Sequence, residues 1–383
     1  MLRVLTLSTL YPNPVQPGLG GFCARQTERL GARPDVEVQV IAPVAKFPLS
    51  LPGAPYSALR SVPVQEQRGG LTVHHPRFTN VPVVGWRWSA EAVARAVLPL
   101  ARQLHAERPF DVVDCQFMFP DAVAAHQISR TLHIPYSLKA RGSDIHFWGA
   151  RTRARRQIIG AGRHANGILA VSSALKRDMS RFGLSRERID VHYTGVELER
   201  FSPKAAPKAE RPLLISVGNL VPLKRHDLLV DMMVHLPDVA LEIIGEGPER
   251  HSIARRIERL KLGDRVRLLG RLPHDELPAR LAAAHALVHA SEREGLANVW
   301  MEAMASGTPV VTTNVGGAAE VVTPATGALL PKDSSAVAMA HAVQELLASP
   351  PDRAKIREAV LPFSWQANTD ALYAHLARLS GRK

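Results

Sequence analysis

Short runs of β-branched and other apolar residues alternate with longer segments of helical spacing through the first half of the chain. Runs separated in this way are typical of parallel strands joined by helices that cover both faces of a sheet. The predicted strands occupy residues 4–8, 36–42, 111–116, 136–139, 167–171 and 189–192. This half therefore predicts a doubly wound α/β domain.

A second series of the same kind follows a break in the pattern. Residues 202–211 read SPKAAPKAER and are polar and proline-bearing, which indicates a linker. A chain of 383 residues is long enough for two hydrophobic cores. We therefore expect two Rossmann-like domains, residues 1–205 and 206–362. The strands predicted in the second are 213–217, 240–244, 266–269, 286–289 and 309–312.

The end of the chain carries an apolar stripe at helical spacing, formed by Trp365, Leu372, Tyr373, Leu376 and Leu379. We expect residues 363–383 to form a helix that packs back toward the N-terminal domain. Open α/β sheets bind ligands beyond the carboxyl ends of their strands. Two such domains facing each other across a cleft would suit an enzyme with two substrates.

Composition indicates a cytoplasmic protein. Hydrophobic residues make up 46% of the chain, and no stretch approaches the roughly 18 consecutive apolar residues of a membrane span. Met1 leads directly into the first predicted strand, without the pattern of a signal peptide. In a reducing compartment Cys23 and Cys115 are expected to be buried free thiols.

Positive charge is concentrated in the first half. Residues 1–205 hold 27 Lys and Arg against 15 Asp and Glu, a surplus of 12, while residues 206–383 hold 21 against 20. Two interpretations remain open, a solvated arginine face and adsorption to an anionic membrane surface. No aromatic residues interleave with the densest run, so nucleic acid is disfavoured as a partner. That run is Arg151, Arg153, Arg155, Arg156 and Arg163.

The segment 291–309, SEREGLANVWMEAMASGTP, carries the clearest chemistry. A turn at Gly295 leads into a predicted helix over 297–306, whose first amides, near Leu296 and Ala297, would face an anion such as a diphosphate. Its neighbouring carboxylates could accept hydrogen bonds from sugar hydroxyls, Glu302 from a ribose and Glu294 from a transferred sugar. By spacing alone, both glutamates could equally be surface charges.

The longer segment EGLANVWMEAMASGTPVVTTNVGGAAEVV resembles the signature of the large family of retaining GT-B glycosyltransferases that use nucleotide-activated sugars. The resemblance continues through most of the chain in the family's order. It implies an α/β GT-B fold and transfer of a sugar from a nucleotide-diphosphate donor.

Residues 214–228, LISVGNLVPLKRHDL, resemble the strand, loop and helix that hold the donor phosphates in this family. Lys224 matches the family's phosphate-binding lysine. Asn219 stands where the family usually has an arginine, and Arg225 is a candidate to compensate for that missing charge.

Two glycine clusters complete the predicted donor site. Gly245, Glu246 and Gly247 resemble the family's turn on which the nucleotide base rests, where glycine lets the backbone approach a flat ring. Gly20 and Gly21 follow the first strand and precede a helix, which fits a loop lying over the diphosphate.

Residues 137–146, SLKARGSDIH, resemble a family loop that usually reads His-Gly-Ser-Asp or His-Gly-Thr-Asp. Arg141 replaces the family histidine, which contacts the sugar near the reacting carbon. A fixed guanidinium at Arg141 could instead stabilise the departing diphosphate. Asp144 could orient Arg141 or bind the acceptor, and the two side chains could also form a structural ion pair.

We expect neither a cofactor nor a metal requirement. The histidines show no metalloprotease spacing, and no Asp-any-Asp triplet occurs to bridge a metal and a diphosphate. The resemblance implies a retaining, metal-independent enzyme of the hexosyltransferase type. Its acceptor would be a glycan or a lipid-linked molecule in surface polysaccharide or glycolipid biosynthesis, with the enzyme at the inner face of the membrane.

Three other functions remain open. A different GT-B enzyme is one, although nothing marks the lysine that a pyridoxal-phosphate-dependent phosphorylase needs; a sugar-nucleotide epimerase belongs to the same group. The substitution at Arg141 leaves room for a noncatalytic sugar-nucleotide-binding protein. A basic nucleic-acid-binding protein is disfavoured by the near-neutral second half.

Overall fold

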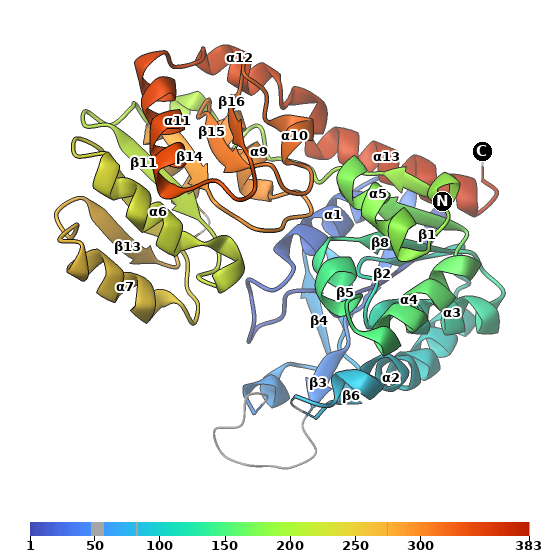
Figure 1. The fold of residues 1–383 in the computed structure, drawn as a ribbon. Helices are drawn as coiled ribbons and strands as arrows, with labels where there is room; N and C mark the ends of the chain where they lie inside the picture. Colours follow the sequence, from blue (N-terminus) through green and yellow to red (C-terminus); the bar gives the residue numbers. More distant parts are fainter. Residues whose placement is uncertain (47–56, 82, 274, 383) are drawn as a thin grey trace. The chain divides into compact units, whose positions relative to one another are not determined.

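The computed structural model describes residues 1–46, 57–81, 83–273 and 275–382, which form two α/β units (Figure 1). The first unit consists of residues 1–193 and 365–383, and the second of residues 194–364. The predicted boundary at 205/206 therefore lies too late in the chain. Residues 194–205 pack in the second unit because the Arg357 guanidinium donates to the carbonyls of Leu198 and Phe201.

The first unit is built on an eight-stranded sheet of order β10-β9-β8-β7-β1-β2-β5-β4. All of its pairings are parallel except that of β4 with β5. The strands are β1 (Leu2–Leu7), β2 (Val36–Ile41), β4 (Gln65–Arg68), β5 (Leu71–His74), β7 (Val112–Cys115), β8 (Tyr136–Ala140), β9 (Gly167–Ala170) and β10 (Ile189–Val191).

Four strands of this unit were not predicted. β4 and β5 form a hairpin, and β3 (Val44–Lys46) pairs with β6 (Arg77–Thr79) in a separate ribbon. They are short, and β4 reads QEQR with no buried residue, so its sequence carries no apolar alternation.

Six helices cover this sheet: α1 (Gly21–Gly31), α2 (Trp86–Glu107), α3 (Asp121–Leu132), α4 (Thr152–His164), α5 (Ser173–Phe182) and α13 (Trp365–Leu379). The C-terminal helix α13 shares a core with α1, where Leu372 and Leu376 pack in one cluster with Cys23. Cys23 and Cys115 are buried free thiols, which confirms the prediction for both.

The second unit has a six-stranded parallel sheet of order β13-β12-β11-β14-β15-β16. Its strands are β11 (Leu213–Val217), β12 (Ala240–Ile244), β13 (Val266–Gly270), β14 (Ala286–His289), β15 (Val310–Thr313) and β16 (Gly327–Leu330), of which only β16 was not predicted. Its helices are α6 (His226–Met232), α7 (Arg250–Arg259), α8 (Leu277–Ala283), α9 (Asn298–Ala305), α10 (Ala318–Val321), α11 (Ala336–Ala348) and α12 (Arg353–Glu358).

Each sheet has a point at which its strand order reverses. In the second unit the chain moves from β11 to β12 and β13 on one side, and continues from β14 on the other side of β11. In the first unit the same reversal lies between β1 and β7. Loops part at such a point and leave room for a ligand at the carboxyl ends of the strands. The predicted α/β fold class is confirmed.

Candidate active site

Two predicted residues meet at the reversal point of the second unit. Lys224 lies in the loop after β11 and Glu294 in the loop after β14, 70 positions further along the chain. The Lys224 Nζ is 2.5 Å from the Glu294 Oε1, and the two side chains are 20% and 12% exposed. A hydrogen bond of 2.9 Å from the Glu292 N–H to the Leu223 carbonyl holds the two loops together. The structure thus creates an accessible ion pair where ligands of open sheets bind.

The glycines predicted to rest under a base fit closely against the loop after β11. A Cβ on Gly245, whose φ is +150°, would collide with the Gly218 carbonyl, and one on Gly247 would collide with the Leu220 carbonyl. The Leu220 N–H in turn donates to the Glu246 carbonyl at 2.9 Å. These glycines are therefore required for the approach of two loops, a packing reason that the sequence did not show.

The loop after β14 is also held from its other side. The Gly317 N–H donates to the Gly295 carbonyl at 2.8 Å, and a Cβ on Gly316 (φ +54°) would collide with the Glu294 carbonyl. This contact fixes the backbone that carries Glu294. A three-loop cradle results, built from the segments after β11, β14 and β15.

Helix α9 begins at Asn298, one residue after the predicted start, with Leu296 and Ala297 buried just before it. Ala297 is the N-cap residue and has no side-chain oxygen to accept from the first-turn amides. An uncapped helix start of this kind can bind an anion through those amides and the helix dipole.

Glu302 lies in the same helix and is 9% exposed. Among the described acidic residues of the second unit it alone is classed as buried. A buried carboxylate is costly unless it is hydrogen-bonded, so Glu302 is not the solvated helix-face charge that the sequence also allowed.

Two buried histidines in this region were not predicted. The His289 Nε2 lies 3.0 Å from the Val217 carbonyl, and its Nδ1 accepts from the Trp300 Nε1 at 3.2 Å, so both ring nitrogens are engaged in the neutral form. Burial, and secondarily the charge of Lys224, lower the pKa of His289 well below its usual value and that of His226 to about 4. Lys224 therefore carries the local positive charge.

Three predicted donor residues are not directed to the ion pair. The Arg225 guanidinium donates to the Lys332 carbonyl at 3.4 Å, and its backbone is left-handed, with φ +49°. The carboxylate of Glu246 pairs with Arg250 at 3.2 Å. Asn219 is exposed on the loop that follows β11. The structure accordingly does not bring a second cation to Lys224 in place of the missing family arginine.

In the first unit, Arg141 follows β8 and its guanidinium is held by glutamines. Its Nε donates to the Gln116 carbonyl at 3.2 Å, and one Nη donates to the side-chain oxygens of Gln116 and Gln26. The guanidinium also lies 4.8 Å from the centre of the Phe22 ring. These contacts present a guanidinium of fixed orientation beside the start of α1.

Asp144 does not pair with that guanidinium, which excludes the structural ion pair that the sequence left open. Its carboxylate is fully buried and accepts from the backbone N–H groups of Arg141, Gly142, Ile145 and Met118, at 2.8 to 3.2 Å. Burial raises the pKa of Asp144, while those four amides oppose the rise. Asp144 shapes the loop that carries Arg141 and is closed to an acceptor.

Beneath Arg141 lies a buried polar cluster that the sequence did not reveal. The Lys139 Nζ donates to the Gln26 Oε1 at 2.9 Å and to the His192 Nδ1, while the His192 Nε2 donates to the Asn368 carbonyl at 3.0 Å. Burial, followed by the charge of Arg141, lowers the pKa of Lys139 well below its usual range. The Gln26 Oε1 accepts hydrogen bonds from both Lys139 and Arg141, and so links the cluster to Arg141.

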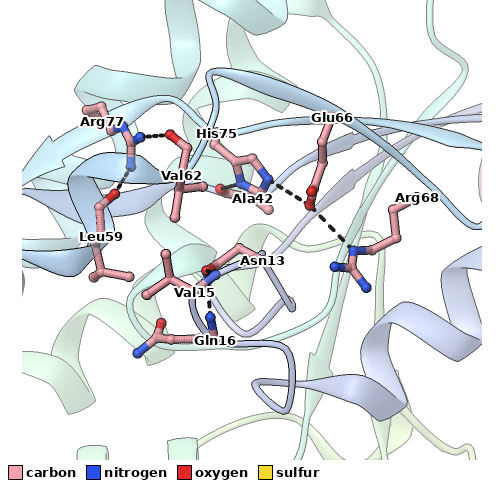
Figure 2. A network of polar contacts seen from close by, with 10 residues as sticks. All are labelled: Asn13, Val15, Gln16, Ala42, Leu59, Val62, Glu66, Arg68, His75 and Arg77. Carbon is pink, nitrogen blue, oxygen red and sulfur yellow. Dashed lines mark hydrogen bonds and ion pairs between the residues drawn. The ribbon is translucent and has the colours of Figure 1, made fainter.

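The loop after β1 is shaped by close contacts. A Cβ on Gly20 (φ +62°) would collide with the Leu10 carbonyl, whereas a Cβ on Gly21 would meet nothing within 4 Å. Earlier in the loop, the Asn13 Oδ1 accepts from the N–H groups of Val15 and Gln16 at 3.1 and 2.9 Å (Figure 2). Gly20 is thus required by packing, and Gly21 opens α1 without that constraint.

Two features are absent from the described residues, a cluster of metal ligands and a membrane-spanning helix. In the parts of the chain that the structure describes, no three histidine, cysteine or carboxylate side chains gather as a metal would require. Across the same described parts, none of the helices combines the length and the apolar character needed to span a bilayer.

Comparison with known proteins defines the class. Residues 198–360 match the family described as glycosyl transferases group 1, and residues 22–200 match glycosyltransferase family 4. The sucrose-phosphate synthase of Thermosynechococcus elongatus shares the fold, with a TM-score of 0.79 at 20% identity over 100% of both chains.

Two of the relatives that are similar in sequence illustrate the class. A putative teichuronic acid biosynthesis glycosyltransferase (TuaC) of Bacillus subtilis is 28% identical over 89% of this chain and 88% of its own. A GDP-mannose-dependent α-(1-6)-phosphatidylinositol monomannoside mannosyltransferase of Mycolicibacterium smegmatis is 31% identical over 62% of this chain and 68% of its own.

The two doubly wound units have the GT-B fold, and the chain is a nucleotide-sugar-dependent glycosyltransferase. The chain belongs to the glycosyl transferases group 1 family.

Proposed function

We propose that this enzyme transfers a sugar, with retention and without a metal, from a nucleotide-diphosphate donor to a glycan or lipid-linked acceptor in surface polysaccharide or glycolipid assembly. The observation that carries the proposal is the ion pair between Lys224 and Glu294 at the reversal point of the second sheet. It supplies one cation and one carboxylate, which suit a diphosphate and the hydroxyls of a sugar respectively.

Donor binding would exchange the partners of this pair. The diphosphate takes the ammonium of Lys224, together with the first amides of α9, and Glu294 is released to accept hydrogen bonds from sugar hydroxyls. Because the pair is partly exposed, water and ligand can reach it, so the exchange requires no change of fold. Glu302, deeper in the same helix, would accept from the ribose.

Retention would follow a same-face route. A double displacement needs a carboxylate nucleophile beneath the sugar, and Glu294 is committed to hydroxyls in this scheme. The departing diphosphate can itself accept the proton of the acceptor hydroxyl while the new glycosidic bond forms. Its growing charge would be stabilised by Lys224, backbone amides and the fixed guanidinium of Arg141.

The acceptor class is supported by the relatives and by charge. One relative is named for teichuronic acid biosynthesis and the other for mannosyl transfer to phosphatidylinositol monomannoside. Residues 1–205 carry a surplus of 12 positive charges (27 minus 15), which suits an acidic or lipid-linked acceptor at the inner face of a membrane.

A donor screen tests the proposal directly. The protein is mixed with UDP-, GDP-, ADP- and TDP-sugars, and thermal shift and donor hydrolysis are measured; a noncatalytic protein would bind a donor without ever hydrolysing or transferring it. Proton NMR of the first product with the chosen donor should then show the anomeric configuration of the donor. An inverted product, or activity that EDTA abolishes and magnesium or manganese restores, would overturn the mechanism.

A further inference from the structure

Large apolar side chains are exposed together at the start of α2 and in the turn before α4. Five of the ten large hydrophobic residues exposed among the described part of the chain lie here, namely Val81, Val83, Val84, Trp88 and Phe147. Val83 is 90% exposed, and Trp88 and Phe147 are each 52% exposed. We call these five residues the apolar tip. Such a concentration marks an interaction surface, whereas single exposed apolar residues do not.

Contacts between the two segments make the tip one surface. The rings of Trp86 and Trp148 are 6.4 Å apart, which joins the start of α2 to the residue after Phe147. The Arg151 guanidinium lies 4.2 Å from the Phe147 ring, 5.0 Å from the Trp148 ring and 5.3 Å from the Trp86 ring. The Arg151 guanidinium and two half-buried indole rings therefore connect the start of α2 to the segment that carries Phe147.

The backbone at the centre of the tip is strained. Val83 has a φ of +67°, a left-handed conformation that is an outlier for a β-branched residue. A neighbouring turn, closed by the Gly85 N–H donating to the Val81 carbonyl at 2.7 Å, holds this conformation. Burial in an apolar phase would offset the strain of an otherwise solvent-facing valine.

A collar of arginines surrounds the tip. Residues 81–95 and 147–163 contain seven arginines and one acidic residue, Glu91, a surplus of six positive charges. Glu91 is already paired with Arg153 at 2.6 Å. The arginines exposed on this surface are Arg87, Arg95, Arg153, Arg155, Arg156 and Arg163. The face is therefore apolar at its centre and strongly cationic at its edge.

We propose that the apolar tip inserts into the boundary between headgroups and acyl chains of an anionic bilayer while the arginine collar binds lipid phosphates. Tryptophan and phenylalanine beside arginine are the residues that favour this boundary. A second copy of the chain suits the face poorly, because its collar would bring six surplus positive charges against six. The inference rests on the proposed function in one respect, that a lipid-linked acceptor gives the enzyme a reason to be at the membrane.

Flotation with vesicles tests both parts of the surface. The full chain is mixed with vesicles of phosphatidylcholine alone or with phosphatidylglycerol, at low and high salt. The tip is altered by Val83→Ser, Trp88→Ser and Phe147→Ser together, and the collar by Arg87→Glu with Arg156→Glu. Matched controls on the second unit are the triple Val234→Ser, Val337→Ser, Leu361→Ser and the double Arg255→Glu, Arg259→Glu, all at exposed positions.

Wild type and both controls should bind phosphatidylglycerol vesicles alike and more weakly at high salt. Loss of two arginines near an anionic surface should weaken partitioning about 30-fold or more. The tip variant should bind less tightly at every salt concentration. Brominated lipids should quench the tryptophan fluorescence of the wild type, and Trp88→Phe should reduce that quenching to the part contributed by the half-buried Trp86 and Trp148, because Trp300 and Trp365 are buried.

Several results would overturn the inference. They are equal binding to neutral and anionic vesicles, an unquenched Trp88, a control double variant as impaired as the collar variant, or a wild-type dimer that the tip variant dissociates. Circular dichroism and nucleotide binding on the same samples show whether each variant is folded. Because lipid binding is read without any donor, failure here and failure of the proposed transferase activity are distinguishable.

Discussion

Each unit holds a lysine in a polar cluster at or beyond the carboxyl end of a strand, but the two clusters are built in opposite ways. In the second unit Lys224 and Glu294 neutralise each other at an accessible position. In the first unit Lys139 is fully buried, and the partners of its ammonium are the neutral side chains of Gln26 and His192. The ion pair of the second unit can exchange partners with a ligand, whereas the buried lysine of the first unit is a rigid support.

This difference separates binding from positioning. The Lys224–Glu294 pair is reachable from solvent, so a ligand can replace either partner without leaving a buried charge unpaired. A buried lysine with a lowered pKa stabilises nothing by charge, but its hydrogen bonds orient Gln26 and, through it, Arg141. We therefore expect substitutions in the second unit to remove donor chemistry and substitutions beneath Arg141 to misplace a group.

The largest effect should come from the ion pair. Lys224→Ala and Glu294→Ala should each lower kcat by about 10²- to 10³-fold, the range seen when one preorganised charge-stabilising group is lost. In kcat/KM, which refers to the free enzyme, the double variant should lose much less than the product of the two single losses, because each residue is the other's partner in the free enzyme. Steady-state transfer assays on all three variants measure this coupling. Strict additivity would show that the pair does not act as a unit.

Arg141 should come next. Arg141→Ala should lower kcat by up to about 10²-fold, with the Kd for nucleotide unchanged in calorimetry. Lys139→Met keeps the length of the buried side chain and removes its hydrogen bonds to Gln26 and His192. It should lower kcat less and leave the protein folded, as expected of a positioning residue. Equal loss from both variants, or a matched rise in Kd, would remove the distinction between support and site.

A smaller effect is expected at the predicted ribose contact. Glu302→Ala should weaken nucleotide binding by about 1.5 to 3 kcal/mol, the value of a hydrogen bond made by a charged group. Glu358→Ala, at the exposed end of α12 in the same unit, is a control of matching charge change. An unchanged nucleotide Kd in a folded Glu302 variant would contradict the ribose role.

The last effect concerns stability in acid rather than catalysis, and the two units should behave alike in it. Burial lowers the pKa of His226 and His375 to about 4, and that of His192 and His289 well below normal. As the pH falls from about 6.5 to about 4, the unfolded chain binds protons that the folded chain does not, so the folded state loses up to about 3 kcal/mol for each of His226 and His375.

Buried carboxyls act in the opposite sense. Burial raises the pKa of Asp121 to about 7 and also raises that of Asp114 and Asp144, so these groups favour the folded state as the pH falls and oppose the four histidines. Urea unfolding at a series of pH values should show a net loss in the free energy of unfolding toward acid pH. His375→Gln should make this dependence on pH less steep. The exposed His341→Gln should leave the slope unchanged; if it alters the slope as much, buried histidines are not the cause.

The donor side could be predicted from the sequence because its residues lie in short continuous segments. The turn at Gly295, the start of α9 and the lysine after β11 follow local rules of strand, turn and helix, and each predicted segment was found at or within one residue of its place. The ribbon of β3 and β6 and the edge strands β4 and β16 escaped because short segments there lack an apolar period.

By itself the sequence determined the alternation of strands and helices, the glycines and the charged residues of the donor cradle. Only the tertiary structure decided which of these meet: that Lys224 faces Glu294, that Arg225 turns to Lys332, that Asp144 binds backbone amides, and that the apolar tip gathers in one place. The reason is physical. Periodicity and turn chemistry act over a few residues, whereas burial and polar pairing depend on residues far apart in the chain that packing alone brings together.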